Sequence, residues 1–147
     1  MSKTPIATVT TTINAPASKV WDALTKPDQI KQYLFGTDVT TDWKVGSPIT
    51  FRGEFNGHKY EDKGVIKTVQ PEKKLSFTHW SSLSKMPDKP ENYHIVTFDL
   101  VPAGKGTEVT LTQENQNESE PRTPKVTEEL KKNWSMLLAG LKKTVED

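Results

Sequence analysis

Residues 130–145 read LKKNWSMLLAGLKKTV, and their apolar residues repeat with the period of a helix. Thr123 followed by Pro124 suits the start of a helix here, and Thr127 is the alternative N-cap. A helix with one apolar face needs an apolar surface to cover. The apolar residues recur every three or four positions and share one face of a helix of about six turns: Leu130, Trp134, Leu137, Leu138, Leu141 and Val145.

The sequence before this helix supplies such a surface, because its apolar residues alternate with polar ones. A period of two predicts strands with one apolar face. Asn56-Gly57 is typical of a two-residue hairpin, and Gly104-Lys105-Gly106 indicates a second turn. The alternation slips near Gly64, which predicts a bulge or a strong twist. Six strands are expected, around residues 6–13, 49–55, 58–69, 75–80, 96–100 and 109–111.

Two short helical segments are expected after the first strand, one from Ala17 to before Pro27 and one within residues 28–35. Because the other strands follow one another without helices between them, the order predicts an α+β fold with a six-stranded antiparallel sheet. The length of 147 residues fits one domain, residues 1–147. A twisted sheet around one long helix leaves space for a small ligand unless large side chains fill it.

Composition excludes several classes of protein. The 20 Lys and Arg nearly balance the 19 Asp and Glu, and only Arg52 and Arg122 are arginines, so no nucleic-acid partner is expected. No apolar run approaches the roughly 20 residues of a membrane span, and the first residues lack the apolar core of a signal peptide. A cytoplasmic location follows as an expectation.

Neither a metal site nor a cofactor is expected. Cys is absent, and His58, His79 and His94 fall on different predicted strands. No G-x-S-x-G motif surrounds a serine. The Glu61-Asp62 and Glu128-Glu129 pairs are interpreted as structural. His79 could act as a general base, but the sequence offers it no orienting partner, so no catalytic residue is assigned.

The aromatic residues are the candidates for binding. Their side chains can fill the core, or they can line a cavity. Trp43 belongs to these aromatic residues, in addition to those listed below. If the strand around Phe77 keeps its alternation, His79 faces the cavity and Trp80 faces away, whereas a bulge would reverse them. Entry is expected past residues 35–45 or 82–92. The candidate ligand-binding residues are Phe51, Phe55, Tyr60, Phe77, His79, Tyr93, Phe98, Trp134, Leu138 and Leu141.

Order and spacing over more than 120 positions give a resemblance to a known family. The chain resembles the bacterial single-domain branch of the family named for the activator of the Hsp90 ATPase, in the START-like or SRPBCC superfamily. It departs from many relatives at His79, where they have Trp. The residues that carry the resemblance are Ile13-Asn14-Ala15-Pro16, Val20-Trp21-Asp22-Ala23-Leu24-Thr25, Pro27, Gly46, Gly64-Val65-Ile66, Pro71, Leu75-Ser76-Phe77-Thr78, Val96-Thr97-Phe98-Asp99-Leu100, residues 106–112 and Trp134.

The resemblance implies a helix-grip fold and three functions. Superfamily relatives bind lipids, sterols, polyketides and flavonoids between sheet and helix, which implies non-enzymatic binding of a small hydrophobic, lipid-like or aromatic molecule. The family name implies instead a chaperone partner and a role in stress response. A minority of relatives are enzymes of the cyclase or hydratase kind, for which only His79, Tyr60 and Tyr93 would be available here.

Overall fold

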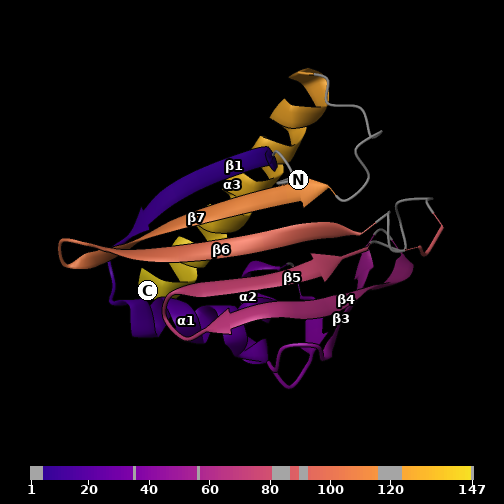
Figure 1. Ribbon diagram of the computed structural model, residues 1–147, viewed down its shortest axis with the longest axis horizontal. Coiled ribbons are helices and arrows are strands. Elements are labelled where there is room, and N and C mark those ends of the chain that lie inside the picture. Colours follow the sequence, from indigo (N-terminus) through magenta and orange to yellow (C-terminus); the bar gives the residue numbers. More distant parts are fainter. Residues whose placement is uncertain are drawn as a thin grey trace.

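The computed structural model describes residues 5–34, 36–55, 57–80, 87–89, 93–115 and 124–146 (Figure 1). One antiparallel sheet has the strand order β1-β7-β6-β5-β4-β3-β2. Its strands are β1 (Pro5–Ile13), β2 (Asp38–Thr40), β3 (Pro48–Phe55), β4 (His58–Gln70), β5 (Lys74–His79), β6 (His94–Ala103) and β7 (Gly106–Asn115). The helices are α1 (Ala17–Thr25), α2 (Pro27–Tyr33) and α3 (Pro124–Glu146).

The α+β, helix-grip prediction is confirmed, but the described residues hold seven strands where six were predicted. The additional strand is β2, which pairs with β3 through Val39 opposite Phe51. Three residues are too few for an alternation of apolar and polar side chains to be recognised. Residues 35–45 were interpreted as a loop, and the structure places the edge of the sheet within them.

Tight turns connect the central strands where the sequence predicts them. Phe55 pairs with His58, and Gly57 between them has φ of +77°, a conformation that favours glycine. At the second turn, Ala103 pairs with Gly106. The irregularity predicted near Gly64 lies slightly later in β4, where the register with β5 shifts between Ile66 and Thr68 and leaves β4 with one extra residue.

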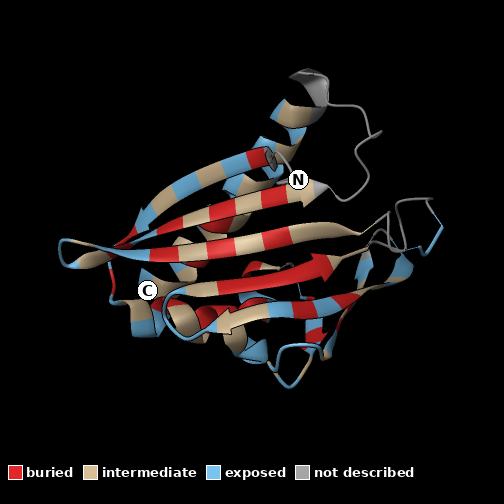
Figure 2. Cartoon of the chain, viewed as in Figure 1, coloured by how far each residue is buried: buried red, intermediate tan, exposed pale blue. Residues whose placement is uncertain are grey.

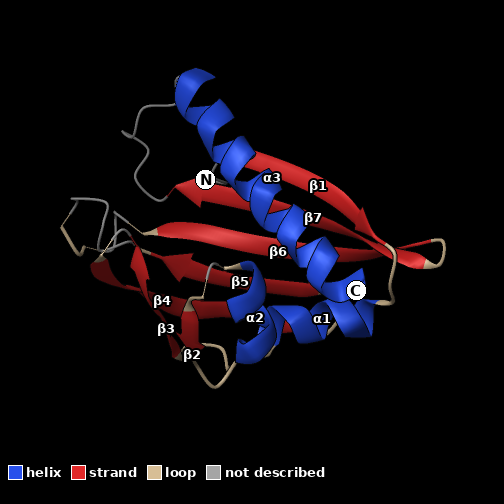
Figure 3. Cartoon of the chain, turned by 180° about the vertical axis from the view of Figure 1, so that it is seen from behind, coloured by secondary structure: helices blue, strands red, loops and turns tan. Residues whose placement is uncertain are grey.

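All three helices lie on one face of the sheet, and α3 crosses it diagonally (Figure 3). The start of α3 at Pro124 agrees with the sequence, while Thr123 lies outside the described residues. Its last turn is fixed to the segment after β1, because the carboxylate of Glu146 accepts a hydrogen bond from the backbone N–H of Asn14 at 2.7 Å. In the described part of the chain, every helix is too short or too polar to cross a bilayer.

Buried side chains alternate along β6 and β7, as their sequence period predicts (Figure 2). Strand β5 differs, because four successive residues from Leu75 to Thr78 are buried. Gly64 of β4 lies against this strand so closely that a Cβ there would overlap the carbonyl oxygen of Thr78. The centre of the sheet is therefore tightly packed, and the space for a site lies between the sheet and the helices.

Candidate functional site: a cavity between sheet and helices

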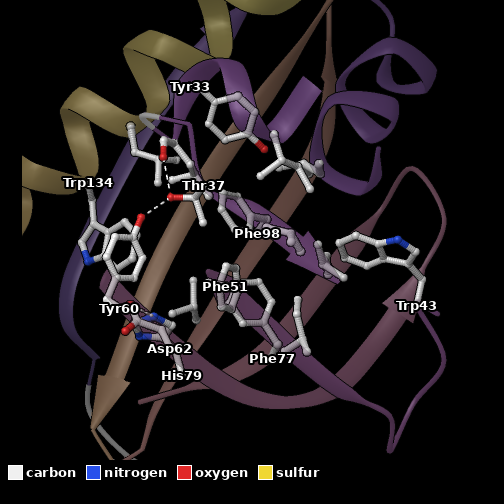
Figure 4. Close-up of a pocket in the computed structure, with 18 of the residues that line it drawn as sticks. Tyr33, Thr37, Trp43, Phe51, Tyr60, Asp62, Phe77, His79, Phe98 and Trp134 are labelled. Atoms are coloured by element: carbon white, nitrogen blue, oxygen red, sulfur yellow. Dashed lines mark hydrogen bonds and ion pairs between the residues drawn. The ribbon is translucent and has the colours of Figure 1, made fainter. Parts of the chain in front are cut away.

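A cavity of about 330 Å³ lies between the sheet, α2 and α3 (Figure 4). Its volume is near the lower end of the roughly 300–1,000 Å³ of small-molecule sites. Most of its wall is apolar, which favours an apolar occupant. The lining residues are Leu24, Ile30, Tyr33, Leu34, Thr37, Val39, Trp43, Ile49, Phe51, Glu54, Tyr60, Asp62, Leu75, Phe77, His79, Val96, Phe98, Trp134 and Leu137.

Three phenylalanines from three strands form the floor of the cavity. Phe51 of β3 and Phe77 of β5 have ring centroids 5.7 Å apart, and Phe77 and Phe98 of β6 are 6.5 Å apart. Both pairs are tilted rather than face to face, as aromatic rings prefer. The strand alternation brings these rings to one face, so three of the sequence-predicted candidates lie together.

The middle of α3 closes the cavity from the other side. Trp134 and Leu137 line it, and the indole N–H of Trp134 donates to Oε1 of the buried Gln113 at 2.8 Å. Leu138 and Leu141 were predicted to bind ligand, but they lie outside the lining and are almost completely buried in the core. A shared helix stripe does not reveal which of its residues have a void in front of them.

At Gly140, between Leu138 and Leu141 in the sequence, α3 comes close to α2. A Cβ at Gly140 would lie 3.1 Å from the Cβ of Tyr33. The two helices are therefore in close contact at this point. Tyr33 was not among the predicted site residues. Its hydroxyl donates to the carbonyl oxygen of Ala23 at 2.7 Å, and burial raises the pKa of this hydroxyl above its usual range.

A carboxylate and an imidazole form a pair in the wall. Nε2 of His79 lies 3.3 Å from Oδ2 of Asp62, and the His79 ring meets the Phe51 ring edge-on at a centroid distance of 5.3 Å. The strand keeps its alternation, so His79 lines the cavity as predicted, and Trp80 does not. Asp62 is the orienting partner that the sequence analysis did not find.

The alternation in β4 could have identified Asp62. Tyr60 and Asp62 are two residues apart and both line the cavity, whereas Glu61 between them faces outward and pairs with Arg52 at 2.9 Å. The interpretation of Glu61-Asp62 as a structural pair was correct that the two face opposite ways. That interpretation did not consider that Asp62 then shares a face of the strand with Tyr60.

A second polar group in the wall consists of two hydroxyls. Oγ1 of Thr37 donates to the carbonyl oxygen of Leu34 at 2.6 Å and lies 2.5 Å from the hydroxyl of Tyr60. The Tyr60 ring passes over Gly53, its cross-strand partner, where a Cβ would overlap the hydroxyl. Gly53 thus gives Tyr60 the room to reach Thr37 (Figure 4).

Tyr93 is not part of the cavity, which corrects the expectation for this residue. Its ring stacks on Trp80 at a centroid distance of 6.4 Å, and its hydroxyl donates to Oδ1 of Asp88 at 2.5 Å. Burial and the Asp88 carboxylate raise the pKa of Tyr93 to about 12. The side chain of Phe55 lies outside the described part of the structure. Trp43, absent from the list of candidates, does line the cavity.

Metal binding finds no support in the described ranges. No three of their His, Asp or Glu side chains come close enough together to hold an ion, and the sequence has no Cys. The described lining offers apolar burial with a few directional polar contacts.

Comparisons with known proteins agree with this architecture. The family model described as Activator of Hsp90 ATPase homolog 1-like protein matches residues 14–146. A solution structure from Cytophaga hutchinsonii is 49% identical, with a TM-score of 0.82, over 99% of this chain and 97% of the other. No curated protein matches the sequence.

More distant structures share the fold. A crystal structure of a Mesorhizobium loti protein is 25% identical, with a TM-score of 0.71 and 95% of both chains covered. A solution structure described as the Aha1 dimer of Colwellia psychrerythraea is 23% identical, with the same TM-score of 0.71 and the same coverage.

Proposed function

The chain belongs to the activator of Hsp90 ATPase homolog 1-like family, and on this premise we propose that it binds a small hydrophobic molecule without transforming it. The observation that carries the proposal is the cavity of about 330 Å³ with its aromatic floor and the Trp134–Leu137 wall. A cytoplasmic location and a role in stress response remain predictions from the sequence.

The size of the cavity favours a ligand of one or two rings, or a short chain. Such a compound has roughly 250 Å² of apolar surface, and its burial contributes about 6 kcal/mol at about 25 cal/mol per Å². The loss of translational and rotational freedom reduces this gain. We expect dissociation constants between micromolar and millimolar for simple aromatic probes.

The segment that carries β2 is the proposed entrance. Thr37, Val39 and Trp43 lie within residues 35–45 and all line the cavity. Trp43 has φ of +60°, which is unfavourable for a bulky side chain. Of the other proposed entrance, residues 82–92, the described part comprises only residues 87–89.

The proposal is tested by filling the cavity from α3. Leu137→Trp places a large aromatic ring at a lining position. We expect this variant to abolish binding of 2-methoxynaphthalene, measured by calorimetry or by NMR titration. Met136→Trp is the matched control, because Met136 directly precedes Leu137 and its side chain is exposed. Equal binding by the Leu137→Trp and wild-type proteins would contradict the proposal, as would absence of binding to wild type.

A chaperone partner is the second candidate, and the description of the matching family favours it. A purified bacterial Hsp90-type chaperone at micromolar concentration should then bind the chain, and Leu137→Trp should leave that contact unchanged. Absence of association in this assay counts against the candidate. Among the described residues, the large exposed apolar side chains are distributed over different segments: Val45, Val65, Val101 and Met136.

A further inference from the structure

The hydrogen-bond donors in the cavity wall are mostly used within the protein. The hydroxyl of Tyr33 donates to Ala23, and the indole N–H of Trp134 donates to Gln113. Neither proton is available to a ligand. Among the described lining residues, the indole N–H of Trp43 is the exception, and Trp43 lies across the cavity from Tyr60 and Asp62 (Figure 4).

The two hydroxyls at Thr37 follow the same pattern. A hydroxyl has a single proton, and that of Thr37 goes to the carbonyl oxygen of Leu34, which can only accept. In the contact between Thr37 and Tyr60, the Tyr60 hydroxyl must therefore be the donor. Tyr60 thus keeps only lone pairs for a ligand and can act toward it solely as an acceptor.

A neutral imidazole at His79 is also left as an acceptor. An ionised carboxylate accepts but does not donate, so the nitrogen that faces Asp62, Nε2, carries the proton. In neutral imidazole the other nitrogen, Nδ1, then has a free lone pair. It has no hydrogen-bond partner among the described residues, and no buried side-chain nitrogen or oxygen lacks one, so Nδ1 is accessible.

The charges of the lining residues favour a ligand that carries no negative charge. Its charged side chains are the carboxylates Glu54 and Asp62, and the described lining contains neither Lys nor Arg. An anionic ligand would find no lysine or arginine among these described residues, and desolvating it would be costly. The carboxylate of a fatty acid is therefore a poor match for this cavity.

We propose that the ligand is a small, uncharged aromatic molecule whose polar end is a hydrogen-bond donor, such as a phenolic hydroxyl, directed at His79 and Tyr60. This inference rests on the proposed function and adds the chemical class of the ligand to it. The apolar floor holds the rings, and the donor meets the acceptors on the side of the cavity where Tyr60, Asp62 and His79 lie together (Figure 4).

Three probes with the same ring system test this proposal at pH 7: 2-naphthol, 2-methoxynaphthalene and 2-naphthoate. We expect 2-naphthol to bind about three- to tenfold more tightly than the ether, which lacks the donor. The carboxylate should bind most weakly. Equal affinity of naphthol and ether, or tightest binding by naphthoate, would overturn the inference and leave the proposed function standing. Absence of binding by both neutral probes would overturn both.

Two variants identify the acceptor. His79→Phe keeps a ring beside Phe51 but removes Nδ1, and it should reduce the preference for naphthol over ether to about one. Tyr60→Phe should reduce it by a smaller factor, and it provides the test if His79→Phe does not fold. Tyr93→Phe is the control, because this hydroxyl lies outside the cavity. An unchanged preference in both the His79 and the Tyr60 variants would overturn the proposal.

Discussion

The apolar stripe of α3 has two parts with different surroundings. One part lies over the cavity, and the other, called here the sealed half, is buried in the core. Trp134 and Leu137 lie over the cavity, whereas Leu138 and Leu141 are sealed in the core. Gly140, where the helix packs against α2, lies between these two sealed residues in the sequence. A hydrophobic position can therefore serve stability or binding, depending on how closely the neighbouring element approaches.

The largest expected effect is on the sealed half. Leu138→Ala removes a side chain that is 2% exposed and leaves a void, so we expect it to lower the free energy of unfolding by about 3 kcal/mol. Chemical denaturation measures this loss. The affinity for 2-methoxynaphthalene should change little as long as the protein is folded. A loss below about 1 kcal/mol would show that this half is not tightly packed.

The adjacent residue provides the contrast. Leu137→Ala removes a half-buried side chain that already borders a void, so the expected loss of unfolding free energy is only about 1 kcal/mol. The enlarged cavity should accept three-ring aromatic probes better than wild type does. Denaturation and NMR titration together check both statements, and equal destabilisation by Leu137→Ala and Leu138→Ala would remove the distinction between the halves.

The smallest expected effect concerns the last turn of α3, which Glu146 fixes to the segment after β1. Hydrogen bonds from Lys142 and from the Asn14 backbone N–H lower the pKa of Glu146 below its ordinary value of 4.5. A lowered pKa stabilises the fold above that value, and this contribution is lost as the pH falls through the lowered pKa. Glu146→Gln should therefore flatten the dependence of stability on pH below about 5.

Thermal unfolding between pH 3 and pH 7 measures this effect. Glu108→Gln, on the exposed side of β7, serves as the comparison. If both variants show the pH dependence of wild type, the Glu146 contact with Asn14 does not contribute to stability.

The sequence was most informative where a long pattern repeats. The period of two in β6 and β7 and the stripe on α3 predicted the sheet and its covering helix, and Phe51, Phe77 and Phe98 lie together as expected. Strand β2 was missed because its three residues are too few to form a recognisable alternation. Periodicity along the sequence therefore predicts long strands well and very short strands poorly.

The candidate site was harder to predict, because lining depends on distances between elements. Leu138 carries the same sequence signal as Leu137, yet only Leu137 has a void before it. Tyr93 directly precedes β6 and still packs on Trp80 outside the cavity. Asp62 could have been found from its alternation with Tyr60, although its contact with His79 also depends on the register between β4 and β5.

The most direct test of the account is an NMR titration of labelled protein with 2-methoxynaphthalene. We predict saturable chemical-shift changes at Phe51, Phe77 and Trp134, with little change at Leu141 in the sealed half. Absence of saturable shifts in a folded protein, or shifts concentrated on the sealed half of α3, would contradict the claim that the cavity between the sheet and α3 is the binding site.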